Sequence, residues 1–121
     1  MNALIIDDSR TTRAIIGRFL SALGYETAEA GDGAAGLAHL AAAGAPDIAF
    51  VDWNMPEMTG IEFVKHARRE ARYDGMQIVM VTSENEMANV AEALEAGANE
   101  YLMKPFTKEG LAEKIALLSL S

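Results

Sequence analysis

The chain has 121 residues, of which 50% are hydrophobic and 23% charged, with a formal net charge of -8 and no cysteine. This length predicts one domain over residues 1–121, and the excess of acids argues against nucleic acid or an anionic membrane as partner. Disulfides are excluded, and we find neither a signal peptide nor an apolar run of about 18 residues, the length of a membrane span. We therefore expect a monomeric, cytoplasmic protein that binds another protein or a metal cation.

The first half of the chain predicts two strands and two helices. Residues 3–6 are apolar throughout, as in a strand buried on both faces, and two aspartates follow them. Ser9 is placed to cap the next helix, which we expect to end at Gly24. Residues 26–30 predict a weaker second strand, and an alanine-rich helix follows the turn at residues 31–33.

The second half repeats this pattern three times. Apolar runs at residues 48–51, 77–81 and 101–103 predict three further strands, each followed by a helix. The helix before the last strand has apolar side chains at i, i+3, i+4 and i+7, namely Met87, Val90, Ala91 and Leu94, and the final helix has Leu111, Ile115 and Leu118 on one face. Alternating strands and helices predict an α/β fold, a single doubly wound five-stranded parallel sheet with helices on both faces.

Polar side chains follow four of these strands where each strand ends. Because the carboxyl ends of parallel strands share one edge of the sheet, we expect five groups to meet in one cleft: Asp7, Asp8, Asp52, Thr82 and Lys104. Three carboxylates in one place repel one another, and Mg²⁺ is a counter-charge that prefers oxygen ligands. We expect Asp8 and Asp52 as direct ligands and Asp7 as a ligand through water. The carbonyl of Asn54 can supply a further oxygen.

Asp52 is the candidate reactive residue of this cleft. A carboxylate beside Mg²⁺ and the Lys104 ammonium is arranged for attack on phosphorus, because phosphoryl transfer needs mainly alignment and charge neutralisation. The product would be an aspartyl phosphate, whose oxygens Mg²⁺, Lys104, the Thr82 hydroxyl and nearby backbone N–H groups can bind. We therefore predict a phosphoacceptor that catalyses only its own phosphorylation and dephosphorylation, and not an enzyme.

Taken together, these motifs resemble the receiver domain of two-component response regulators, and within that family the stand-alone CheY-like chemotaxis regulators. The motifs are Asp7-Asp8, Asp52-Trp53-Asn54-Met55-Pro56, Val81-Thr82-Ser83-Glu84, Ala96-Gly97-Ala98, and Tyr101 with Lys104-Pro105-Phe106. The resemblance spans essentially the whole chain and implies a flavodoxin-like sheet with strand order 2-1-3-4-5. It also implies that Asp52 accepts its phosphoryl group from a phosphohistidine on a histidine kinase.

The resemblance assigns roles to the other site residues. Thr82 corresponds to the switch hydroxyl, Tyr101 to an aromatic residue that changes rotamer, and Lys104 to the phosphate-binding lysine. Glu84, two residues beyond Thr82, is expected to border the cleft and, with Asn54, to tune the lifetime of the phosphate.

Two local features accompany these roles. The resemblance implies a cis Lys104-Pro105 peptide bond, and Ser83 stands where chemotaxis regulators often carry alanine. The output surface implied by the family combines the helix at residues 87–96, the strand at residues 101–103 and the last helix from Lys108. Its implied partner is a flagellar-motor switch component.

Several functions remain open from the sequence. The leading interpretation is a phosphorylation-dependent binding switch, and the alternatives are a phosphorelay intermediate without its own target, a scaffold, or a receiver domain cut from a larger regulator at Ser121. An aspartyl-phosphate phosphohydrolase resembling the haloacid-dehalogenase-like phosphatases would carry a second acid two residues after the nucleophile. This chain has Asn54 there, which leaves no general acid.

Overall fold

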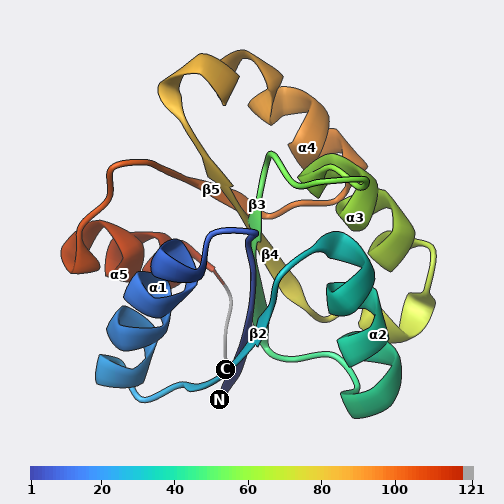
Figure 1. Cartoon of the computed structure of the whole chain (residues 1–121), viewed down its shortest axis with the longest axis horizontal. Helices are drawn as coiled ribbons and strands as arrows, with labels where there is room; N and C mark the ends of the chain where they lie inside the picture. The colour runs from blue at the N-terminus through green and yellow to red at the C-terminus, as the bar shows by residue number, and fades with distance from the viewer. Residues whose placement is uncertain (119–121) are drawn as a thin grey trace.

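Five parallel strands form the central sheet (Figure 1). The computed structural model describes residues 1–118, and its strands are β1 (Asn2–Ile6), β2 (Glu26–Ala30), β3 (Ile48–Asp52), β4 (Gln77–Thr82) and β5 (Glu100–Met103). Their order across the sheet is β2-β1-β3-β4-β5. The predicted fold class, strand order and strand positions are therefore confirmed, with each strand within one residue of its predicted ends.

The helices cover both faces of the sheet, as Figure 1 shows. They are α1 (Arg10–Ala22), α2 (Gly33–Ala43), α3 (Gly60–Arg68), α4 (Val90–Ala96) and α5 (Lys108–Leu117), with short 3-10 helices η1 (Ala71–Tyr73) and η2 (Glu84–Asn89). Side chains alternate along a strand, so β1 sends Ala3 and Ile5 to the core under α1 and α5, and Leu4 and Ile6 to the core under α2, α3 and α4. No helix among residues 1–118 is long and apolar enough to cross a membrane.

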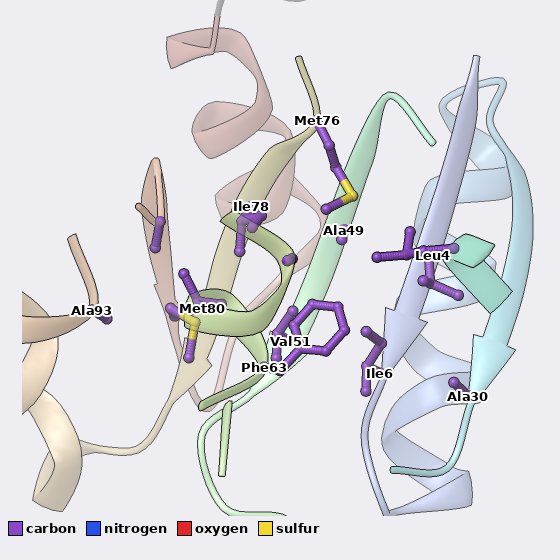
Figure 2. Packing of buried hydrophobic residues seen from close by; sticks show 14 of the residues in the cluster. Leu4, Ile6, Ala30, Ala49, Val51, Phe63, Met76, Ile78, Met80 and Ala93 are labelled. Atoms are coloured by element: carbon purple, nitrogen blue, oxygen red, sulfur yellow. The ribbon is translucent and has the colours of Figure 1, made fainter. Parts of the chain in front are cut away.

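The core under α2, α3 and α4 is shown from close by in Figure 2. Phe63 of α3 lies against strand side chains that include Ile6, Val51 and Met80, all of them buried (Figure 2). Trp53, the residue after β3, is buried in the same cluster. This core therefore extends to the loop that follows Asp52, and it holds the end of β3 in a fixed position.

The helix boundaries follow local capping signals. The predicted Ser9 cap is present, because its hydroxyl accepts a hydrogen bond from the Thr12 N–H at 3.2 Å. At the start of α3, Thr59 and Glu62 form a reciprocal capping box. The next residue, Gly60, packs so closely on the end of β3 that a Cβ atom there would overlap the carbonyl oxygen of Asp52.

The prediction for the helix at residues 87–96 was partly wrong. Its first part is the 3-10 helix η2, and the α-helix α4 begins only at Val90. Val90 and Ala93 are the buried residues of α4, whereas Ala91 and Leu94 are exposed. The α-helix is only seven residues long and buries one narrow face, so the predicted i, i+3, i+4, i+7 stripe does not face the core as a whole.

A single arginine ties α3 to the end of α4. The Arg68 guanidinium donates hydrogen bonds to the carbonyl oxygens of Gly97 (3.0 Å), Tyr73 (2.8 Å) and Met76 (2.7 Å). It also donates to the side-chain oxygen of Asn99 at 3.0 Å. Four acceptors from two segments, the α3–β4 and α4–β5 connections, are therefore held by one planar group, which fixes the carboxyl end of α4 relative to α3.

Candidate functional site

The ends of β1, β3, β4 and β5 bring the predicted site residues to one edge of the sheet. Asp52 pairs with Val81 across the β3–β4 ladder, so it lies one position before the end of β4 at Thr82. The Lys104 N–H donates to the carbonyl oxygen of Thr82 at 2.7 Å and fixes the chain after β5 beside the end of β4. The peptide bond between Lys104 and Pro105 is cis, as predicted.

The three aspartates converge as expected. Asp7, Asp8 and Asp52 each place a carboxylate oxygen within 4.8 Å of the others. Asp7 and Asp52 are buried, with 1% and 6% of their surface exposed, whereas Asp8 is exposed. The Lys104 ammonium lies 3.2 Å from Asp52 Oδ1 and 3.9 Å from Asp7 Oδ2. The Lys104 ammonium is therefore shared between two buried carboxylates.

The electrostatics of the cluster indicate a shortage of positive charge. Burial, followed by the charge of Asp7, raises the pKa of the Asp52 carboxyl to about 6, although Lys104 opposes this shift. Burial also raises the pKa of Asp7, against the opposing effects of the Ser9 N–H, which donates to its Oδ1 at 2.8 Å, and of Lys104. Asp7 Oδ2 is buried and has no hydrogen-bond partner. An oxygen-rich site with an unpartnered carboxylate oxygen fits a hard divalent cation such as Mg²⁺.

Within residues 1–118, the side chains of the two predicted switch residues, Thr82 and Tyr101, make no hydrogen bond to this cluster. Thr82 is fully buried, and its hydroxyl lies 3.2 Å from the carbonyl oxygen of Ser83 and 3.5 Å from Met87 Sδ. Tyr101 is half-buried on β5, with the Lys114 ammonium 4.1 Å from the centre of its ring. Thr82 therefore contacts η2, the segment that leads to α4, and Tyr101 contacts α5 itself.

Arg13 was missed by the sequence analysis. Its Nη1 donates to the carbonyl oxygen of Asp7 at 2.6 Å, and its Nε forms an ion pair with Glu29 of β2 at 2.9 Å. Arg13 therefore holds the loop of the aspartate pair against β2. The sequence signal was a basic residue in the first turns of α1, but nothing in the sequence indicated the position of Glu29.

Glu86 makes contacts that the sequence analysis did not predict. Its Oε1 accepts a hydrogen bond from the Ser83 N–H at 2.9 Å, and its Oε2 accepts one from the Asn54 side chain. Ser83 and Glu86 form a capping box, a four-residue signal that was visible in the sequence. Glu84 is exposed and makes no side-chain hydrogen bond within residues 1–118, so its role at the cleft stays a prediction.

The fold and the site define a doubly wound α/β domain with an acidic centre, suited to a cation, at the carboxyl ends of its strands. The protein-family model of the response regulator receiver domain matches residues 3–116, so the chain belongs to this family. Such domains are signalling components of two-component systems and not classical enzymes. Self-catalysed phosphorylation and dephosphorylation stay a prediction.

The chain is similar over nearly its full length to individual chemotaxis proteins. The chain is 43% identical over 119 residues to the chemotaxis protein CheY1 of Helicobacter pylori, covering 98% of this chain and 96% of that protein. It is 44% identical over 116 residues to CheY of Pseudomonas aeruginosa, covering 95% and 93% of the two chains. The solved structure of CheY4 from Vibrio cholerae has a TM-score of 0.88 at 36% identity and covers 96% of each chain. The predicted CheY-like resemblance is confirmed.

Proposed function

We propose that this protein is a phosphorylation-dependent chemotaxis regulator, in which Asp52 accepts a phosphoryl group from a phosphohistidine on a histidine kinase. The observation that carries the proposal is the position of Asp52, buried at the end of β3 with the Lys104 ammonium 3.2 Å from its Oδ1. An Asp52 oxygen forms the new bond to phosphorus while the bond between phosphorus and the histidine nitrogen breaks. Lys104 neutralises charge that would oppose the approach of the donor.

The metal of this proposal is Mg²⁺. Asp8, Asp52 and the carbonyl of Asn54 would hold it, with Asp7 binding through water, and the acidic cluster with the unpartnered oxygen of Asp7 supports this assignment. When bound, Mg²⁺ supplies positive charge to the transferring phosphoryl group. Because the protein side chains alone leave one ammonium for two buried carboxylates, we expect little phosphorylation without the ion.

Thr82 and Tyr101 would carry the signal from Asp52 to the surface. The Thr82 hydroxyl exchanges its local contact with the Ser83 carbonyl for a phosphoryl oxygen, which is a stronger, charge-assisted acceptor. This movement opens space beside β5, and the Tyr101 ring turns inward, away from Lys114. A half-buried ring at the edge strand is a suitable reporter, since its rotamer changes what a partner contacts.

The surface around β5 is the proposed docking site for a downstream protein. β5 is one of the two edge strands of the sheet. Large apolar side chains are exposed on each of the three elements there: Leu94 of α4 (42%), Met103 of β5 (43%) and Leu117 of α5 (69%). By similarity to the CheY relatives, the target would be a component of the flagellar switch. With a net charge of -8, a protein target is favoured over nucleic acid.

Two measurements test the proposal. Acetyl phosphate with Mg²⁺ should label Asp52, as detected by mass spectrometry, and Asp52→Asn should remove the label. Isothermal titration of the purified flagellar-switch target should show tighter binding in the presence of beryllofluoride, a mimic of the phosphoryl group. Labelling without any change in target affinity would instead favour a phosphorelay intermediate.

A further inference from the structure

Glu86 connects the two loops that border Asp52. Its carboxylate accepts one hydrogen bond from the Ser83 N–H at 2.9 Å and another from the Asn54 side chain. Asn54 follows Asp52 by two residues, and Ser83 directly follows Thr82 at the end of β4. No other acid of this region, Glu84, Glu92 or Glu95, forms a side-chain hydrogen bond within the described part of the chain. The bridge is therefore specific to Glu86.

Both donors of this bridge belong to residues that closely follow the ends of β3 and β4, at the edge of the sheet that carries Asp52. Asp52 pairs with Val81, which places the peptide after Thr82 at the same edge of the sheet as the Asp52 carboxylate. The Ser83 N–H already donates to an anionic oxygen in the unphosphorylated protein. A backbone N–H carries a single hydrogen and makes one strong hydrogen bond, so the two anions cannot both use it fully.

We propose that Glu86 is an internal competitor of the phosphoryl group. In the unphosphorylated protein its carboxylate holds the Ser83 N–H and the Asn54 amide, and phosphorylation of Asp52 displaces it. The inference rests on the proposed role of Asp52 as phosphoacceptor. Glu86 is thus a positioning residue that lowers the affinity of the site for the phosphoryl group. Its release also frees η2, the segment that leads into α4 and the proposed docking surface.

A purely structural role for Glu86 makes a different prediction. Ser83 and Glu86 form a capping box, and glutamine serves in such a box as well as glutamate does. Glu86→Gln therefore keeps the cap while removing the negative charge that competes with the phosphoryl group. If Glu86 only stabilises η2, this variant should bind a phosphoryl mimic as the wild type does.

The test is a titration with beryllofluoride at saturating Mg²⁺, followed by calorimetry, for the wild type, Glu86→Gln and Glu86→Ala. We expect both variants to bind about 3- to 10-fold more tightly than the wild type, the scale of one ordinary net hydrogen bond. Glu92→Gln is the matched control, because Glu92 is an exposed acid on α4 without such a bridge, and its affinity should stay within about twofold of the wild type. Glu86→Gln carries the test if Glu86→Ala fails to fold.

The amide resonance of Ser83 provides a signature of the exchange. Glu86→Gln should shift this resonance in the free protein, because the acceptor changes from a carboxylate to an amide. The shift should vanish with beryllofluoride bound, when the N–H donates to the mimic in both proteins. Equal affinities for the wild type and Glu86→Gln, or a shift that persists in the bound state, would overturn the inference. A wild type that does not bind beryllofluoride at all would overturn the proposed function and the inference with it.

Discussion

Replacing Asp52 by asparagine should stabilise the metal-free protein at neutral pH. The pKa of the Asp52 carboxyl is raised from its ordinary value of 3.8 to about 6 by burial and by the charge of Asp7. A shift of this size corresponds to about 3 kcal/mol of unfavourable free energy for the ionised form, with the attraction of Lys104 already included. Asparagine has nearly the same shape and no charge. We therefore expect Asp52→Asn to raise the free energy of unfolding by about 2–3 kcal/mol.

The pH dependence follows from the sign of the shift. Because the pKa is higher in the folded protein, ionisation of Asp52 destabilises the fold: the penalty is absent below pH of about 4, grows between pH 4 and 6, and is complete at pH 7. Urea unfolding in the presence of a chelator, at pH 4 and pH 7.5, measures the gain directly. Adding Mg²⁺ should narrow the difference at pH 7.5, since the ion stabilises the carboxylate of the wild type.

The control for this experiment is Glu92→Gln, which removes one negative charge from an exposed position on α4. Its effect on the free energy of unfolding should stay within about 0.5 kcal/mol. If Asp52→Asn is no more stable than the wild type at pH 7.5 without metal, the reasoning is refuted. A gain of equal size at pH 4 would refute it as well, because the carboxyl of the folded protein is then protonated and most of the penalty is absent.

Three further predictions concern the site and its output. Asp8→Ala should weaken Mg²⁺ binding at least about tenfold, measured by the fluorescence of Trp53, the only tryptophan; an unchanged titration would argue against the metal site. Arg13→Met should weaken Mg²⁺ binding in the same assay, because the Asp7 carbonyl loses its 2.6 Å hydrogen bond, and equal affinity would limit Arg13 to stabilising the fold. Tyr101→Ala should leave labelling of Asp52 by acetyl phosphate nearly intact while changing target affinity about 5- to 150-fold, and an unchanged affinity in calorimetry would remove Tyr101 from the switch.

The sheet and the position of the acidic cluster were accessible from the sequence for a physical reason. Strands such as residues 48–51 are buried on both faces and must be apolar throughout, so a polar residue marks the end of the strand. In a parallel sheet these ends meet at one edge, whatever the details of the loops. Asp7, Asp52 and Lys104 were therefore brought together by topology alone.

The contacts made by loops were not accessible in the same way. The bridge from Glu86 to Asn54 joins residues 32 positions apart, and it depends on the paths of two irregular segments. Likewise, apolar spacing placed Leu94 in the core, but the structure begins α4 at Val90 and turns Leu94 to the surface. Periodicity predicts that a helix forms, and tertiary packing then decides which part of it is buried.

The clamp formed by Arg68 gives α4 two unequal ends. At the carboxyl end, the guanidinium donates hydrogen bonds to Gly97 and Asn99. The amino end continues from η2, which is held by the hydrogen bonds of Glu86. A helix that is held at one end can rotate about that end, and its other end then moves furthest. We expect phosphorylation to rotate α4 about the contacts of Arg68 and to displace its amino end. Lysine cannot reproduce the planar guanidinium and its set of hydrogen bonds. Arg68→Lys should therefore weaken the attachment of the carboxyl end of α4 and change target affinity, although Arg68 lies outside the acidic site.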